Sequence, residues 1–201
     1  MNTESNALSV GVAVIVMASW WVFALLFLLR KREAKAVAQK RKRSSLLGVA
    51  LVGVGYGIVW TMRRPMFTPP FDCGPVVDWG SASAAILLCG CSIALILSAM
   101  RTLGRHWSVE ARLLDGHQLV RSGAYAIVRH PIYSGMLGMM ISTGLAYSIP
   151  VWGLAAVLVA CYGTHLRIKS EEALLKEAFG GKYEEYSREV PALVPWLSWI
   201  R

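Results

Sequence analysis

Two clusters of polar residues lie at the ends of neighbouring apolar stretches and contain the side chains best suited to chemistry. The first cluster contains Arg129, His130 and Tyr133, and the second, further along the chain, contains Arg167 and the adjacent glutamates 171–172. Charged groups at the end of a membrane helix are costly unless they face water, a partner or a ligand. A cation, an imidazole, a phenol and paired carboxylates at one membrane face therefore predict a binding site that opens toward one compartment.

The spacing within each cluster suggests what the side chains do. Arg167 and Glu171 are four residues apart and share a helix face, so they form either an intrahelical ion pair or a pair of ligand-binding groups. In the second case Arg167 binds an anionic group, while Glu171 holds a cation or hydroxyls. Pro131 suits the first turn of a helix, whose free N–H groups bind anions. A snorkelling interfacial set is the alternative, but it explains poorly why all these groups gather at one end of one hairpin.

The composition indicates a membrane protein. The chain has 201 residues, of which 55% are hydrophobic and only 16% are charged, and its mean hydropathy is +0.48. A soluble domain of this length is less apolar and more charged. The apolar residues are concentrated in long uncharged stretches, each about the length that a bilayer requires of a helix. We expect five membrane spans, over residues 8–29, 44–62, 81–100, 132–149 and 150–168.

These spans predict an all-α fold, a polytopic bundle of about five transmembrane helices with a small C-terminal cytoplasmic region. The last two spans are barely separated and form a tight antiparallel hairpin, with Pro150 in the first turn of the second helix. The first span is too long for a secretory signal and has its basic residues after it, so we interpret it as a retained anchor. We expect residues 1–201 to form a single integral-membrane domain.

The positions of the cations predict the orientation. An extracellular N-terminus followed by five spans puts 19 of the 21 Lys and Arg on the cytoplasmic side, in segments 30–43, 101–129 and 167–201. The positive-inside rule requires this asymmetry. The basic runs would then lie against anionic lipid headgroups, and a nucleic-acid partner is not needed to explain the net charge of +9. The short, five-span form suggests the inner membrane of a prokaryotic cell.

Other patterns exclude some kinds of site. The four cysteines and four histidines follow no zinc-binding or HExxH spacing, so we expect no metal. Cys89, Cys91 and Cys161 lie in apolar spans and are expected to be small core residues. The glycine run 53–57 imitates a nucleotide-binding loop, but it lies within an uncharged span, where glycines allow helices to pack closely. We therefore interpret it as a packing surface.

Two segments outside the spans are expected to form a cytoplasmic lid. Residues 101–129 contain more apolar side chains than a free loop, so they should pack on the membrane face or over a ligand. The tail from Glu171 begins as a helix that Gly180 and Gly181 end, and aromatic residues follow. We expect the tail to fold back beneath the hairpin.

The motifs in these segments resemble those of the isoprenylcysteine carboxyl methyltransferase family. Residues 123–135 are similar to its RHPxYxG signature, and residues 103–108 are similar to the stretch upstream of it. The second signature is matched by the paired glutamates and then Phe179, Gly180, Tyr183, Tyr186, Val190, Pro191 and Pro195. The resemblance covers about half of the chain, 103–196, in unbroken order.

This resemblance implies an integral-membrane enzyme that uses S-adenosylmethionine, with a cytoplasmic cofactor pocket between the last two spans and a lipophilic or lipid-modified substrate that enters from the bilayer. Arg167 matches an arginine that holds the carboxylate accepting the methyl group, so Arg167 and Glu171 are the expected catalytic residues. Glu110 departs from the family pattern, where glutamine is expected, although a carboxylate also accepts hydrogen bonds from amino groups. The positions that match cofactor-binding residues are Glu110, His117, Gln118, Leu119, Val120, Tyr125, His130, Pro131, Ile132, Tyr133 and Glu171.

The sequence leaves the methyl acceptor open. The carboxylate of an isoprenylcysteine-like or other isoprenoid or lipid acid is the main expectation, because Arg167 suits an anionic acceptor. Alternatives are N-methylation of phosphatidylethanolamine-type lipids and S-methylation of a small thiol. A lipid-binding scaffold is the non-enzyme alternative. A membrane reductase that uses NADPH is disfavoured because the two glutamates would repel the 2′-phosphate.

Overall fold

The chain folds as a bundle of long helices. The computed structural model describes residues 3–29, 43–65, 68, 71, 73–103 and 119–195, and these ranges contain helices but no β-strand. The elements are α1 (Thr3–Leu28), α2 (Arg43–Thr61), α3 (Pro75–Leu103), the short 3-10 helix η2 (Gly123–Ala126), α4 (Pro131–Tyr147), α5 (Pro150–Phe179) and α6 (Gly181–Glu189). The all-α fold expected from the apolar stretches is thereby confirmed.

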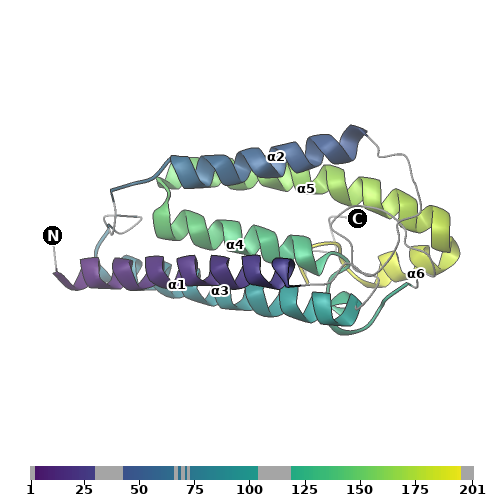
Figure 1. The fold of residues 1–201 in the computed structure, drawn as a ribbon, viewed down its shortest axis with the longest axis horizontal. Coiled ribbons are helices and arrows are strands. Elements are labelled where there is room, and N and C mark those ends of the chain that lie inside the picture. The colour runs from purple at the N-terminus through teal and green to yellow at the C-terminus, as the bar shows by residue number, and fades with distance from the viewer. Residues whose placement is uncertain are drawn as a thin grey trace.

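The long helices form two packed pairs with α4 between them. Helix α2 packs along α5, and α1 packs along α3, while α4 contacts all four of these helices. Figure 1 shows the two pairs on opposite sides of α4, with the first turns of α1 at one end and α6 at the other. The end at which α4 begins, α5 ends and α6 lies is called the α6 end below.

Four helices are long and apolar enough to cross a membrane: Ala7–Leu28, Ser44–Thr61, Pro75–Leu103 and Pro150–Phe179. The remaining expected span, 132–149, corresponds to α4, which has 17 residues and is about 25 Å long at a rise of roughly 1.5 Å per residue. Helix α4 is thus slightly shorter than the hydrocarbon core of a bilayer. The chain is a multi-pass membrane protein with a helical bundle.

Two helices extend beyond the expected spans. Helix α3 begins at Pro75 rather than at residue 81, and α5 continues to Phe179 rather than ending at 168. No helix-breaking residue interrupts α5 until Gly180, which has a positive φ of 50° and ends the helix. The charged residues after the apolar span therefore belong to α5 itself. The helix that was expected to begin the tail does not start separately but is the continuation of α5.

Glycines allow α2 and α5 to approach closely. A Cβ added to Gly48 would lie 2.6 Å from the carbonyl oxygen of Gly163, and one added to Gly163 would lie 2.8 Å from the carbonyl oxygen of Gly48. Within the glycine run on α2, Gly55 lies against Ala156 and Ala160, whereas Gly53 and Gly57 have no such neighbour. The expected packing role is confirmed for Gly55.

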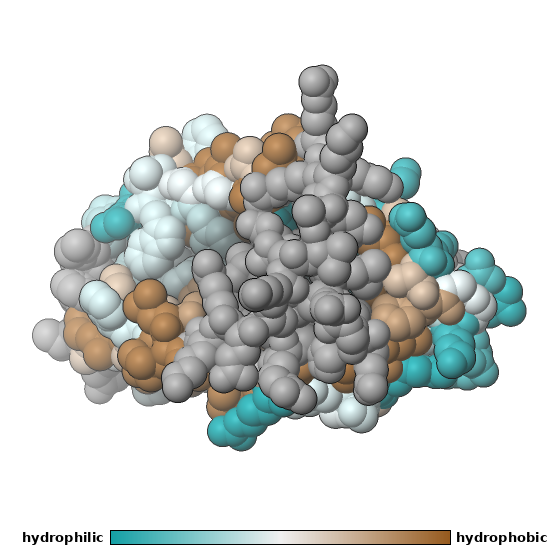
Figure 2. All heavy atoms as spheres, turned by 45° about the vertical axis from the view of Figure 1, so that its right-hand side comes forward, coloured by the Kyte–Doolittle hydropathy of each residue, from teal (hydrophilic) through white to brown (hydrophobic). Residues whose placement is uncertain are grey.

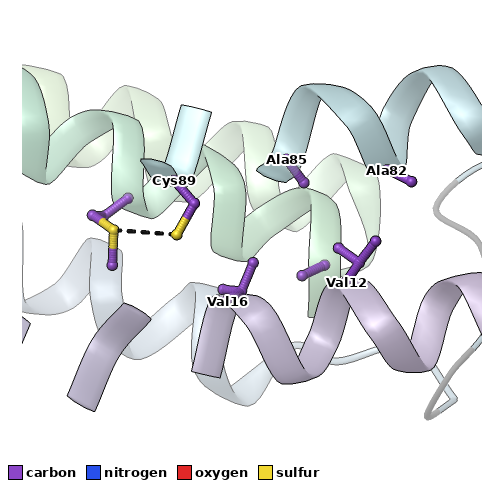
Figure 3. Packing of buried hydrophobic residues seen from close by; sticks show 7 residues of the cluster. Val12, Val16, Ala82, Ala85 and Cys89 are labelled. Carbon is purple, nitrogen blue, oxygen red and sulfur yellow. Dashed lines mark hydrogen bonds between the residues drawn. The ribbon is translucent and has the colours of Figure 1, made fainter. Parts of the chain in front are cut away.

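A second packed region joins α1, α3 and α4. Val12 and Val16 of α1 face Ala82, Ala85 and Cys89 of α3, as Figure 3 shows. The Cys89 sulfur lies 3.6 Å from the sulfur of Met139 on α4, and the dashed line marks this contact. Small residues on α3 make this close three-helix contact possible.

The expectation that three cysteines are core residues is confirmed only for Cys89. Cys91 and Cys161 are exposed on the outside of the bundle. Cys91 is two residues from Cys89, which corresponds to about 200° around a helix, so the two side chains point to different sides. The apolar stretches alone do not show which face of each helix is turned inward.

The outside of the bundle is strongly apolar. Large hydrophobic side chains such as Trp21, Leu28, Val76, Leu87 and Val151 are exposed over most of their surface. The face drawn in Figure 2 carries several such hydrophobic areas, with hydrophilic residues gathered mainly along its right-hand edge. An exposed apolar surface of this extent indicates contact with lipid.

At the end opposite the α6 end, Arg64 holds the α4–α5 turn. Its guanidinium donates hydrogen bonds to the carbonyl oxygens of Leu145, Ala146 and Ser148 at 2.8–2.9 Å. The backbone N–H of Ile149 donates to Met62 at 3.0 Å. The bonds from Arg64 satisfy carbonyls that the end of α4 leaves without helical partners. Pro150 lies in the first turn of α5, as predicted.

Candidate functional site at the α6 end of the bundle

The start of α4 brings the first polar cluster to the α6 end. His130 is the residue before the helix, and Pro131 occupies its first turn, where a missing N–H costs nothing. The N–H groups of Arg129 and His130 donate to the carbonyl oxygens of Pro191 and Ala192 at 2.8 and 3.0 Å. The tail thus packs against the start of α4, which confirms that it folds back beneath the hairpin.

Tyr133 on α4 contacts both Arg167 and Glu171, which share one face of α5. Its hydroxyl donates a hydrogen bond to Glu171 Oε2 at 3.0 Å and accepts one from Arg167 Nε at 3.1 Å. The guanidinium carbon of Arg167 also lies 5.3 Å from the centre of the Tyr133 ring, within the range of a cation–π interaction. The expected sharing of a face by Arg167 and Glu171 is confirmed, and a phenol from the neighbouring helix bridges them.

Arg129, His130 and Glu172 form a second polar group beside the first. Glu172 Oε1 accepts hydrogen bonds from Arg129 Nε at 3.0 Å and Nη2 at 2.8 Å. His130 Nε2 lies 3.3 Å from the same oxygen, while His130 Nδ1 lies 3.9 Å from Glu171 Oε2. The side chains of Arg129 and His130 are only 5% and 4% exposed, so these charge-assisted contacts are largely shielded from water.

A cavity of about 460 Å³ opens beside these groups. Its polar end is formed by Arg129, His130, Tyr133, Arg167 and Glu171. The rest of its wall is mainly apolar and comes from α1, α2, α3, η2, α4 and α5: Phe23, Phe27, Val49, Val52, Tyr56, Leu103, Tyr125, Ile132, Met136, Leu137, Met140, Ala160 and Thr164. The cavity thus joins a charged end to an apolar body.

Helix α6 holds Tyr125, the residue of η2 that lines the cavity. The Tyr186 hydroxyl donates a hydrogen bond to the carbonyl oxygen of Tyr125 at 2.6 Å. Burial raises the pKa of Tyr186 to about 12, so the phenol remains protonated and keeps donating. Arg121 lies over the Tyr186 ring at 5.4 Å and pairs with Glu189 at 2.5 Å. Tyr125 is therefore held in place by the tail.

The structure brings together most of the residues that the sequence singled out. Tyr125, Ile132, His130, Tyr133, Arg167 and Glu171 all line the cavity, and Pro131 is buried directly beside them. Leu119 and Val120 are half-buried and are not among the lining residues. Glu110, His117 and Gln118 lie outside the described residues, as does most of the segment 101–129 expected to cover the site.

Sequence reasoning missed the apolar part of the cavity. Ala160 and Thr164 precede Arg167 on α5 by seven and three residues. On α4, Met136, Leu137 and Met140 follow Tyr133 by three, four and seven residues. These are the spacings of residues on one helix face, so the sequence could have identified all five. Phe23, Phe27, Val49, Val52 and Tyr56 come from α1 and α2, and no local pattern connects them with the site. Among the described residues, no group of three or more His, Cys, Asp or Glu is arranged to hold a metal ion.

Comparisons with known proteins show which sequences this chain is similar to. Residues 84–177 match the sequence model of the isoprenylcysteine carboxyl methyltransferase family. Protein-S-isoprenylcysteine O-methyltransferase B of Arabidopsis thaliana is 36% identical over 103 residues, which are 50% of this chain and 52% of that protein. The protein-S-isoprenylcysteine O-methyltransferases of Mus musculus and Homo sapiens are 31% identical over 127 residues and 33% identical over 106 residues.

The matches cover part of each protein. They include 62% of this chain and 44% of the mouse protein, and 52% of this chain and 37% of the human protein. The chain thus spans about half or less of the length of these curated relatives. They are eukaryotic, so they give no support to the expectation of a prokaryotic cell. The matched residues contain both polar clusters of the cavity, and this region of the chain, 84–177, is similar to the isoprenylcysteine carboxyl methyltransferase family.

Proposed function

We propose that the protein is a membrane methyltransferase that transfers a methyl group from S-adenosylmethionine to the carboxylate of a lipophilic acceptor, such as an S-isoprenylated cysteine. The observation that carries this proposal is a cavity in which a charged end meets an apolar body inside a helical bundle. A cofactor with charged groups and an acceptor with a lipid chain need both environments in one space. The names of the matched relatives support the same acceptor.

The residues at the polar end fit S-adenosylmethionine. Glu171 is a carboxylate at the cavity wall, and its charge suits the cationic amino and sulfonium groups of the cofactor. The rings of Tyr125 and Tyr133 also line the wall, and aromatic faces attract cations. When bound, S-adenosylmethionine supplies a methyl group that its positively charged sulfur activates toward nucleophiles.

Arg167 is placed between the polar end and the apolar body. It is one helical turn deeper along α5 than Glu171, and Thr164 and Ala160 of the apolar wall follow on the same helix. Its guanidinium would hold an acceptor carboxylate at the boundary, with the lipid chain against Val52 and Met140. The contact with Tyr133 fixes the orientation of Arg167, which limits how tightly it can neutralise the acceptor.

Methyl transfer to a carboxylate requires alignment more than acid–base chemistry, because the acceptor is already an anion. The chain's own residues therefore bind, orient and exclude water. Holding two reactants in an attack geometry can lower a barrier by about 7–11 kcal/mol in favourable cases. Rigid helices are suited to this task, since Tyr133 and Arg167 are held on neighbouring rods rather than on loops.

We further propose that the α6 end faces the cytoplasm. The N-terminal end of α1 lies at the opposite end of the bundle. Of the 21 Lys and Arg, 19 fall in segments that an extracellular N-terminus places inside. This orientation satisfies the positive-inside rule and gives the site access to the cytoplasmic cofactor pool.

The decisive experiment combines ligand stabilisation with an acceptor panel. The detergent-purified protein is heated with S-adenosylhomocysteine or with NADPH, and a ligand that binds only the folded state raises the melting temperature. We expect a rise with S-adenosylhomocysteine alone. A rise with NADPH alone, or with neither ligand, would contradict the proposal and favour a reductase or a lipid-binding scaffold.

The acceptor is identified by transfer of a radiolabelled methyl group from S-adenosylmethionine. The panel contains an S-prenylated cysteine with a free carboxylate, its carboxyl amide, a free isoprenoid acid, phosphatidylethanolamine vesicles and a small thiol. We expect label in the S-prenylated cysteine and none in its amide, which lacks the anionic oxygen. Label only in phosphatidylethanolamine or in the thiol would contradict O-methylation.

A further inference from the structure

Glu172 differs from its neighbour Glu171 in the direction of its side chain. Glu171 lines the cavity and Glu172 does not, as expected for adjacent residues that lie about 100° apart around a helix. Only 19% of the Glu172 side chain is exposed, and its Oε1 faces Arg129 and His130. The second carboxylate of the pair therefore contacts Arg129 and His130 without lining the cavity itself.

Arg129 links Glu172 on α5 to α6 and to the residue that follows α6. Besides its two hydrogen bonds to Glu172 on α5, Arg129 donates from Nη1 to the carbonyl oxygens of Ser187 at 2.9 Å and of Val190. Burial and the nearby Glu172 carboxylate also raise the pKa of Tyr183 on α6, so this phenol stays protonated. A carboxylate with a guanidinium this close stays ionised and can only accept hydrogen bonds.

This acceptor determines where His130 carries its hydrogen. An ionised Glu172 at 3.3 Å requires a hydrogen on His130 Nε2, so when the ring is neutral its lone pair is on Nδ1. The ring is also stacked on Tyr133, with 5.7 Å between centroids and 21° between planes, which opposes a flip. Nδ1 lies 3.9 Å from Glu171 Oε2, and both residues line the cavity.

We infer that Glu172 is a positioning residue that fixes the Nε2–H tautomer of His130, so that His130 Nδ1 and Glu171 Oε2 together form a two-acceptor seat for a primary ammonium group. Two acceptors at this separation have no hydrogen to share with each other, whereas an ammonium has three donors to offer them. The seat rests on the proposed function for the identity of its ligand, the amino group of the S-adenosylmethionine amino acid. The tautomer itself depends only on the chain.

The first test is the nitrogen NMR spectrum of the protein labelled with ¹⁵N-histidine, without ligand, with the His130 signals assigned by their loss in His130→Gln. We expect a neutral Nε2–H ring in the wild type and in Glu172→Gln, whose amide oxygen still accepts the bond. In Glu172→Ala we expect a mixture of tautomers. An imidazolium or an Nδ1–H ring in the wild type would overturn the inference, even if Glu172→Ala fails to fold.

The second test measures affinity by calorimetry for S-adenosylhomocysteine and for its analogue with hydrogen in place of the amino group. In the wild type we expect the analogue to bind at least about tenfold more weakly, as for a lost charge-assisted hydrogen bond. Glu172→Ala should lose most of this difference, Glu172→Gln should keep it, and Glu177→Gln, an exposed carboxylate on the same helix, should match the wild type.

The outcomes separate the two proposals. A wild type that binds neither ligand while showing the expected tautomer refutes the proposed function and the ammonium seat, but not the role of Glu172 toward His130. Equal affinity for both ligands in the wild type refutes the seat while leaving the methyltransferase function standing. An unchanged His130 spectrum in a folded Glu172→Ala shows that Glu172 acts only on stability and overturns its positioning role.

Discussion

Tyr133 on α4 donates a hydrogen bond to Glu171 on α5 at 3.0 Å, and the same hydroxyl accepts one from Arg167 at 3.1 Å. A single phenol thus sets the positions of the acid and the cation that face the cavity. Because the three side chains come from two packed helices, their arrangement depends on how α4 and α5 fit together rather than on a loop. The relationship allows each member to be tested separately.

Replacement of Tyr133 by Phe removes both hydrogen bonds and keeps the ring. Hydrogen bonds to charged groups contribute about 1.5–3 kcal/mol each, so we expect a lower melting temperature. Because Arg167 and Glu171 lose their shared partner, we also expect turnover below the melting temperature to fall by about tenfold or more. Steady-state methyl transfer to an S-prenylated cysteine measures this. Tyr162→Phe, an exposed tyrosine on α5, is the matched control and should be neutral. Wild-type turnover in Tyr133→Phe would show that the bridge is dispensable.

Arg167→Ala should separate acceptor binding from cofactor binding. The variant loses the cation that orients an anionic acceptor, so we expect a large loss of turnover on that acceptor with the affinity for S-adenosylhomocysteine largely kept. Kinetics and calorimetry on the same preparation measure the two quantities. Equal losses of turnover and of cofactor affinity would refute this division of roles between Arg167 and Glu171.

The apolar body of the cavity should determine how the lipid chain fits. Val49 lines the cavity from α2 and is partly exposed, so a larger side chain there can enter the cavity without disturbing a closed core. We expect Val49→Trp to raise the KM for the S-prenylated acceptor by about tenfold, a typical effect of altered apolar fit. The affinity for S-adenosylhomocysteine should not change.

Val54→Trp is the control for this substitution, because Val54 is exposed on the same helix and does not line the cavity. Its KM should equal that of the wild type. If both variants raise the KM equally, the effect comes from the outside of the bundle, and the proposal that the cavity binds the lipid chain is wrong.

Two glycines of α2 should respond to alanine with opposite signs. A Cβ at Gly48 would lie 2.6 Å from the Gly163 carbonyl oxygen and 2.8 Å from Arg167 Cγ, so Gly48→Ala should lower stability by about 1–3 kcal/mol and displace Arg167. A Cβ at Gly53 meets no atom within 4 Å, so Gly53→Ala should stabilise the helix by about 0.5–1 kcal/mol. Melting in detergent compares the two, and a more stable Gly48→Ala would contradict the observed packing.

The spans, the helical hairpin and the two polar clusters follow from the sequence because they depend on local properties. Uncharged stretches of sufficient length predict membrane helices, and Pro150 and Gly180 mark a helix start and a helix end. Four-residue spacing predicts that Arg167 and Glu171 share a face. The motif around His130 identified the family whose pattern residues 84–177 match.

The tertiary structure decided which side chains from distant segments meet. No periodicity relates Phe23 and Val49 to Arg167, and their presence in one cavity results from the way α1 and α2 pack against α4 and α5. Likewise, the two adjacent glutamates have the same residue type and nearly the same position, so the sequence does not distinguish them. The helix directs Glu171 into the cavity and Glu172 toward Arg129 because successive residues point about 100° apart, and only the placement of neighbouring helices determines what each one meets.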